Sequence, residues 1–260
     1  MVEIEGKGLD YERYALNKLF KKLVRRHDLR TVLEIPAGGE KAMPSLYSLA
    51  FAEAGCAVTL VNAEEKSKPA WSGLGLGVSH VHADVLHRTG LPEASFDLVW
   101  NFMQLSQYER KDDLLDEMIR LSRRYVMFLA VNRFNPGFFS HRMVHRRFQV
   151  PWTHGDVAFM NPFRVRRYFE GRGLDVVKIG AVDTPPYPDS LGFRDMRLHR
   201  MNVDLSKIDW DSRTLGWMKT GRYPLKLKFL YLFEWLPLPL PLKLLYAHLF
   251  WVLGEKRGRS

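Results

Sequence analysis

The chain has 260 residues, of which 46% are hydrophobic and 26% charged, a composition typical of one large or two small globular domains and not of a disordered chain. A single cysteine, Cys56, excludes an internal disulfide framework and a metal site built from several cysteines. The sequence begins without an apolar signal core, and no stretch of 18 apolar residues lacks charge and proline. We therefore expect neither secretion nor an ordinary membrane-spanning helix.

The net charge of +10 is unevenly distributed along the chain. Residues 36–119 carry a net charge of −6, whereas residues 120–172 carry +9 and residues 219–260 carry +6. All eleven cations of 120–172 are arginines, whose guanidinium groups bind phosphate and carboxylate in bidentate fashion. This segment therefore suits an anionic partner, although a solvated arginine face would have the same composition.

Hydrophobic periodicity predicts helices and strands in alternation after a first amphipathic helix. Short β-branched runs indicate buried strands, and segments with apolar residues three and four apart indicate helices. In chain order we expect a helix at 10–27, a strand at 31–35, a helix at 42–54, a strand at 58–61, a weak helix at 64–74 interrupted by Pro69, and strands at 78–85 and 96–102. A helix at 109–123, a strand at 124–132, a helix at 161–173 and a strand at 175–182 follow.

This alternation predicts an α/β fold with a doubly wound, mostly parallel sheet. In such sheets ligands bind beyond the carboxyl ends of the strands, at the point where the strand order reverses. The informative residues are therefore those that directly follow each predicted strand. We expect three parts, namely an N-terminal helix in 1–30, a Rossmann-like domain in 31–185 with a basic segment around 133–160, and a C-terminal extension in 186–260.

The first four predicted strands and the turns after them carry a recognisable set of motifs. VLEIPAGGE (32–40) is a strand followed by a glycine turn, VTLVN (58–62) ends in a polar residue, and HADV (82–85) precedes LPEASFDLVW (91–100). In this order they resemble the class I S-adenosylmethionine-dependent methyltransferases, in particular the type 11 group that includes the ubiquinone/menaquinone methyltransferases. The resemblance covers residues 30–185 and is most specific in the LP…SFDLV segment.

The resemblance implies a cofactor, S-adenosylmethionine, and places its contacts. The glycine turn lets the backbone approach the methionine portion, because glycine has no Cβ. A polar residue after the second strand would accept from the ribose hydroxyls, and Asp84 after the third would accept from the adenine amino group. The implied cofactor-binding residues are Glu34, Ala37, Gly38, Gly39, Asn62, Glu64, Asp84, Val85 and Asn101.

The sequence departs from the family pattern in the first two motifs. Pro36 and Glu40 stand where the family has the first and last loop glycines. Asn62 stands where an acid is expected, and Glu64, two residues further on, can substitute for it. Two interpretations remain open, a divergent active enzyme or a relative of the family that has lost the cofactor.

The basic segment around 133–160 lies where this fold usually carries its substrate lid. We expect Arg133, His141, Arg146 and Arg147 to contact an acceptor, and His154 is a candidate general base, because histidine titrates near neutral pH. A structural role for His154 is the alternative. His141 and His145 are four residues apart, with His154 near, and could bind a metal on one helical face. Since no carboxylate or cysteine has a matching spacing, we predict no metal site.

Residues 222–253 form an apolar, aromatic-rich tail that three prolines, at 237, 239 and 241, divide into short helices. Aromatic rings mixed with Lys226, Lys228 and Lys243 are typical of a helix that lies in the membrane interface. Packing on the main domain and a dimer contact are the alternatives. We therefore expect a cytoplasmic enzyme with a peripheral membrane association.

These observations predict S-adenosylmethionine-dependent methyl transfer to a small, lipid-like or anionic acceptor at a membrane surface. One alternative is an RNA methyltransferase that uses the arginine segment to bind phosphates. Another is a non-catalytic scaffold that kept the fold. The residues leave the acceptor atom and the oligomeric state open.

Overall fold

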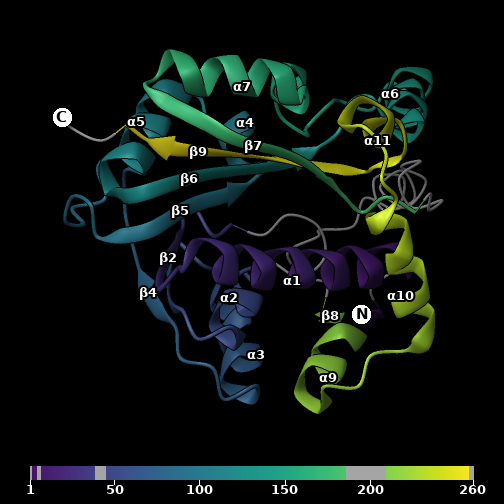
Figure 1. Ribbon diagram of the computed structural model, residues 1–260, viewed down its shortest axis with the longest axis horizontal. Helices are drawn as coiled ribbons and strands as arrows, with labels where there is room; N and C mark the ends of the chain where they lie inside the picture. Colours follow the sequence, from purple (N-terminus) through teal and green to yellow (C-terminus); the bar gives the residue numbers. More distant parts are fainter. Residues whose placement is uncertain (1, 5–6, 39–44, 186–208, 258–260) are drawn as a thin grey trace.

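A seven-stranded sheet with helices on both sides forms the centre of the molecule (Figure 1). The structure is a computed structural model that describes residues 2–4, 7–38, 45–185 and 209–257. The strand order is β4-β3-β2-β5-β6-β9-β7, and all neighbours are parallel except β9, which runs antiparallel to both β6 and β7. The predicted α/β fold with a doubly wound, mostly parallel sheet is confirmed.

The first half of the sheet follows the predicted order closely. Its elements are α1 (Lys7–His27), β2 (Thr31–Glu34), α2 (Leu49–Glu53), β3 (Ala57–Val61), η1 (Glu65–Ser67), α3 (Lys68–Gly73), β4 (Ser79–Val81) and β5 (Phe96–Phe102). Pro69 lies in the first turn of α3 instead of interrupting a longer helix, because proline needs no backbone donor there. A separate pair of parallel strands joins β1 (Val2–Ile4) to β8 (Asp209–Asp211).

The second half completes the sheet and its outer helices. Its elements are α4 (Gln104–Gln107), α5 (Lys111–Leu121), β6 (Ser122–Val131), α6 (Pro136–Arg147), η2 (Val157–Met160), α7 (Pro162–Gly171), β7 (Leu174–Val182), α9 (Arg213–Thr220), α10 (Leu225–Leu230), η5 (Tyr231–Trp235), α11 (Leu240–Tyr246) and β9 (Leu249–Lys256). Figure 1 shows α1 and α2 on one side of the sheet and α5 and α7 on the other.

The prediction that residues 222–253 form short helices is wrong for the last segment, which forms β9. This strand pairs with β6 on one side and β7 on the other, and residues 249–254 are buried. A strand covered on both faces is apolar at successive positions, so its sequence pattern does not differ from that of a buried helix. The boundary expected at residue 185 therefore does not separate the sheet from the extension.

The helical part of the extension is anchored to the sheet domain through Glu234. Its carboxylate accepts hydrogen bonds from the Tyr11 hydroxyl at 3.0 Å and from the Thr184 backbone N–H at 2.9 Å. Lys243 donates to the Glu234 carbonyl at 2.8 Å, so this lysine is not directed toward a membrane as the composition suggested. Among the described residues, none of the helices combines the length and the hydrophobicity that crossing a bilayer requires.

Asp97, from the SFDLV motif, ties the amino ends of β2 and β5 together. Its carboxylate accepts from the backbone N–H groups of Arg30 at 2.8 Å and Thr31 at 3.0 Å, and pairs with Arg123 at 2.9 Å. Burial raises the pKa of Asp97, but these hydrogen bonds and the arginine charge outweigh burial and lower the pKa overall. The motif residue thus holds the start of the sheet, at the end opposite to the predicted site.

We expect Gly180→Ala to destabilise the fold by about 1–3 kcal/mol, because overpacking forces neighbours off their preferred positions. Gly180 lies opposite Trp251 in the β7–β9 register, and a Cβ there would lie 2.3 Å from the indole. Urea unfolding of the wild type and the variant measures the loss, with Gly171→Ala as control because a Cβ at Gly171 meets no neighbour. Equal losses in the two variants would contradict the proposed contact.

Candidate functional site

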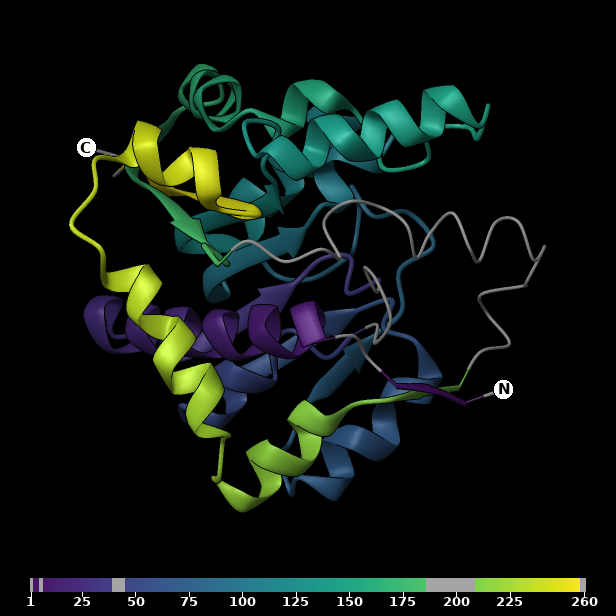
Figure 2. The ribbon, with the colours of Figure 1, turned by 90° about the vertical axis from the view of Figure 1, so that its right-hand side faces the viewer.

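The carboxyl edge of the parallel strands is the candidate site. The strand order reverses between β2 and β5, since β3 and β4 continue on one side and β6 on the other. This edge lies at the right of Figure 1 and faces the viewer in Figure 2, which places the ends of β2, β3, β5 and β6 beside one another. Ligands of doubly wound sheets bind at such a point.

Glu34, the last residue of β2, is buried and bonded to the start of α2. The Ser48 hydroxyl donates to its carboxylate at 2.6 Å, and the Trp100 indole N–H donates to the Ser48 oxygen at 3.1 Å. Burial raises the pKa of Glu34 to about 7, while hydrogen bonds from Ser48 and the charge of Arg13 oppose this shift. The carboxyl group therefore joins β2, α2 and β5, and its implied contact with a cofactor stays a prediction.

Asn62, which follows β3, uses its side-chain amide to hold the loop after β4. Its Nδ2 donates to the Ala83 carbonyl at 2.8 Å, and its Oδ1 accepts from the Ala83 N–H at 2.8 Å. An aspartate could accept from this N–H but could not donate to the carbonyl. The asparagine at this position, where the family has an acid, thus has a structural explanation. Both polar atoms of its side chain form hydrogen bonds with the backbone.

Asn101, near the end of β5, is likewise bonded within the protein. Its Nδ2 donates to the Ile35 carbonyl at 3.1 Å, and its Oδ1 accepts from the Leu105 N–H at 3.3 Å. It is fully buried. These bonds link the turn after β2 to α4, so Asn101 positions both segments at the reversal point of the sheet.

Asp84, Val85 and Glu64 are the predicted cofactor residues whose side chains lie open at this edge. The Asp84 side chain is 94% exposed and its carboxylate lies 3.2 Å from His82 Nε2, while Glu64 pairs with Lys66 at 2.8 Å. Val85 is exposed beside Asp84. Ala37 is buried and its N–H donates to the Val61 carbonyl at 2.7 Å.

Gly38 follows Ala37, and a Cβ there would meet Gln104 at 3.7 Å, an ordinary contact. Gly39 and Glu40 lie outside the described residues.

Helix α6 presents arginines and apolar side chains on one exposed surface. Arg142, Arg146 and Arg147 are exposed, and no acidic partner lies within ion-pair distance of them among the described residues. Arg142 instead lies over the Trp152 ring, 5.6 Å from its centroid. Arg133, in the loop before α6, is half-buried, and its backbone N–H donates to the Met160 carbonyl at 2.9 Å.

Sequence reasoning missed the exposed apolar residues of α6. Phe139 and Met143 are exposed, and Phe148 follows at the end of the helix. In the sequence, the sign of this exposed apolar stripe is the spacing of four and five residues between its members, with arginines among them. It was hidden because an apolar stripe at helical spacing is normally read as the buried face of a helix.

The helical extension leaves a large part of its apolar side chains exposed. We call this set the apolar surface; it comprises Leu225, Phe229, Leu232, Phe233, Trp235, Leu236, Leu238, Leu242, Leu245 and Tyr246. It adjoins α6, because Asn135 at the start of α6 donates to the Tyr246 carbonyl at 2.7 Å. Figure 2 shows α10 and α11 beside the carboxyl edge of the sheet.

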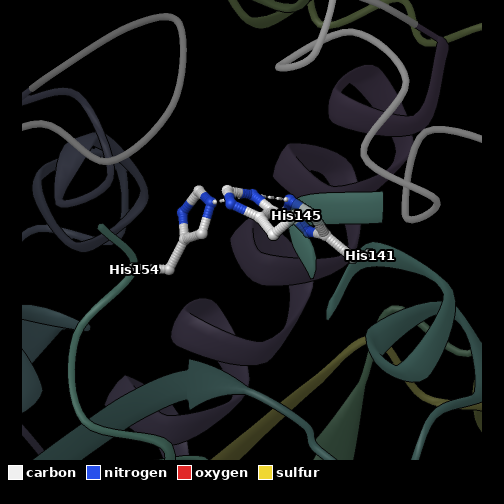
Figure 3. A group of neighbouring side chains, drawn as sticks. All are labelled: His141, His145 and His154. Atoms are coloured by element: carbon white, nitrogen blue, oxygen red, sulfur yellow. Dashed lines mark hydrogen bonds between the residues drawn. The ribbon is translucent and has the colours of Figure 1, made fainter. Parts of the chain in front are cut away.

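The structure brings His141, His145 and His154 together. The Nε2 atoms of His141 and His145 lie 3.0 Å apart, and those of His145 and His154 lie 3.2 Å apart (Figure 3). His145 is buried and the other two are half-buried. His154 therefore belongs to a three-residue cluster, which sequence spacing alone left undecided.

No family model and no curated protein matches this sequence. Solved structures do resemble it over nearly its whole length. An S-adenosylmethionine-dependent methyltransferase from Thermotoga maritima is 14% identical, with a TM-score of 0.53 over 96% of this chain and 92% of that one. One from Archaeoglobus fulgidus is 17% identical, with a TM-score of 0.51 over 92% and 94%.

A structure named as a 4+2 cyclase has a TM-score of 0.55 and is 11% identical over 92% of this chain and 80% of that one. The chain thus has the fold of the class I methyltransferases. At this level of identity the similarity concerns the fold alone.

We expect Asn62→Asp to lower the free energy of unfolding by about 1–3 kcal/mol, because the Ala83 carbonyl loses its donor and faces a carboxylate. Urea unfolding measures this loss, and Asp211→Asn at the exposed end of β8 serves as control. A variant as stable as the wild type would show that the Ala83 bond does not hold the β4 loop.

The raised pKa of Glu34 predicts a pH-dependent stability. Between pH 4.5 and about 7 the native state retains a proton that the unfolded chain has lost, so the wild type loses stability as the pH rises through this window. Glu34→Gln cannot titrate, and its stability relative to the wild type should therefore increase by about 1–3 kcal/mol from pH 4.5 to 8. Unfolding measured across this range, with Glu109→Gln as an exposed control, checks the sign; a constant difference would contradict the assignment.

Proposed function

We propose that the protein is an S-adenosylmethionine-dependent methyltransferase. The observation that carries the proposal is the similarity in fold to solved methyltransferases across at least 92% of the chain. The position of the predicted cofactor residues at the carboxyl edge, on both sides of the strand reversal, supports it. Membership of the type 11 group remains a prediction.

Two of the predicted cofactor residues, Asp84 and Glu64, have carboxylates that fit the hydrogen-bond donors of the cofactor. Both carboxylates are accessible, whereas the amides of Asn62 and Asn101 are bonded to backbone. Asp84 would accept from the adenine amino group and Glu64 from the ribose hydroxyls. Asn62 is then a positioning residue, because its bonds to Ala83 hold the loop that carries Asp84. Bound there, the sulfonium cofactor would supply an activated methyl group.

The acceptor would reach this edge from a membrane surface. The apolar surface meets the amino end of α6, the exposed arginines follow further along this helix, and both elements flank the carboxyl edge (Figure 2). Phe229 is 68% exposed and Trp235 72%, and Lys226 and Lys228, which precede Phe229 in α10, are exposed as well. Aromatic and cationic side chains mixed in this way favour the headgroup region of an anionic bilayer. A lipid-like acceptor is consistent with such a location.

Positioning and desolvation of the nucleophile would provide most of the catalysis, as in-line methyl transfer requires. Arg146 and Arg147 would hold an anionic acceptor through bidentate hydrogen bonds. The apolar residues exposed beside these arginines on α6 favour a lipid interface over RNA. His154 as general base stays a prediction.

We expect the protein to bind S-adenosylhomocysteine, and Asp84→Ala to weaken binding by about 1–3 kcal/mol, the usual cost of deleting one hydrogen-bond partner. Isothermal titration calorimetry measures both. Asp175→Ala, which removes an exposed aspartate at the start of β7, is the matched control. Absence of binding by the folded wild type would support the scaffold alternative and overturn the proposed activity.

Vesicle binding tests the apolar surface without disturbing the fold. We expect full-length protein to bind anionic vesicles better than neutral ones, and Phe229→Ser with Trp235→Ser to weaken binding at least about tenfold, since each apolar side chain buried contributes about 1.5–3 kcal/mol. The control replaces Phe163 and Val177, exposed apolar residues of α7 and β7, with serine. Truncation before residue 222 is unsuitable because it removes β9. Equal vesicle binding by both double variants would exclude the apolar surface as the contact.

A further inference from the structure

The cluster of His141, His145 and His154 has the geometry of a metal site. Metal–nitrogen bonds in a tetrahedral zinc site are about 2.0–2.1 Å long, which places the ligand nitrogens about 3.3 Å apart. The two closest Nε2 pairs here are 3.0 Å and 3.2 Å apart, and all three ligand atoms lie within 4.8 Å of one another.

The backbone around His145 selects the tautomer that a metal ligand needs. Its Nδ1 lies 3.2 Å from the Val150 carbonyl and 3.1 Å from the Pro151 carbonyl. Carbonyl oxygens only accept hydrogen bonds, so Nδ1 carries the proton and Nε2 of the neutral ring carries the lone pair. This Nε2 atom is the one that lies next to the Nε2 atoms of the other two imidazoles (Figure 3). Metal-bound histidines typically donate their second N–H to a carbonyl in this way.

The loop that carries His154 is held in place from two sides. Gly155 has a φ of +80° and packs against α4 so closely that a Cβ would lie 2.5 Å from the Ser106 hydroxyl. The Asp156 N–H donates to the Ser106 carbonyl at 2.9 Å, and the Trp152 indole N–H donates to the Gly155 carbonyl at 2.9 Å. The third histidine is thereby fixed against the pair on α6.

Trp152 also covers the cluster. Its ring centroid lies 5.7 Å from that of His141, 5.2 Å from that of His145 and 4.8 Å from that of His154. An aromatic ring against all three imidazoles restricts their rotation and limits water on that side. Such an enclosing apolar group is typical of metal sites whose ligands are held before the ion binds.

We propose that His141, His145 and His154 bind a divalent transition-metal ion, with Zn²⁺ as the best fit to three neutral imidazoles. Three protein ligands leave a fourth tetrahedral position for water or an oxygen of the acceptor, as in catalytic zinc sites. Since α6 follows β6 and α4 follows β5, this position lies at the carboxyl edge of the sheet. The assignment replaces the general-base role of His154, because a metal-bound imidazole nitrogen has no lone pair with which to accept a proton.

Titration of untagged, chelator-stripped, full-length protein with Zn²⁺ in competition with a chromophoric chelator tests the proposal. We expect one tight equivalent, and at least about 100-fold weaker binding by His145→Gln and by His154→Gln. His80→Gln, an exposed histidine on β4, is the matched control and should bind as the wild type does. Co²⁺ gives a second readout, because a tetrahedral site produces a strong visible absorption band that both cluster variants should lose.

Two outcomes would overturn the assignment. One is a folded wild-type protein that binds no Zn²⁺ tightly. The other is a folded His154→Gln variant that binds Zn²⁺ as tightly as the wild type does. His154 is half-buried in a loop, so this variant keeps the test decisive if His145→Gln does not fold. The titration contains no S-adenosylmethionine, and its result is therefore independent of whether the protein is a methyltransferase.

Discussion

The structure depends on the pairing of β9 between β6 and β7. This strand is the antiparallel partner of both β6 and β7. Its residues also pack against α7. Gly180 leaves room for Trp251, and Gly254 approaches Phe169 and Leu174 so closely that a Cβ would lie 3.0–3.1 Å from them. Because β9 directly follows α11, the same pairing holds the helical extension against the domain. The exposed apolar helices are therefore presented on a rigid support.

At the carboxyl edge, several polar side chains form hydrogen bonds within the protein that hold neighbouring segments together. Asn62 bonds both backbone groups of Ala83, Asn101 links the turn after β2 to α4, and Glu34 joins the start of α2. The family resemblance associates these three positions with the cofactor. In this protein their side chains also hold neighbouring segments together. Among the predicted cofactor residues that the structure describes, the accessible carboxylates are those of Asp84 and Glu64. They are therefore the predicted carboxylates that can contact a nucleoside.

Much of the sheet could be predicted because its parallel strands are short β-branched runs between helices. The strand at 96–102 was predicted with its observed bounds. β9 was missed because a strand covered on both faces shows no alternation, and LFWVL reads equally as helix. The pairing of Asn62 with Ala83 could not be predicted either, since it depends on how β3 and β4 align. In the histidine cluster, sequence spacing indicates the pair on α6, but the approach of His154 depends on the contact between Gly155 and Ser106.

The position of β9 also has a consequence for biosynthesis. Every other strand of the seven-stranded sheet precedes it in the chain, yet its place is between two of them. Until residues 249–256 have emerged from the ribosome, the facing edges of β6 and β7 lack the partner that they have in the folded protein, and unpaired edges promote association with other chains. The sheet therefore closes late in synthesis, and a nascent chain stalled before β9 would be a natural substrate for chaperones.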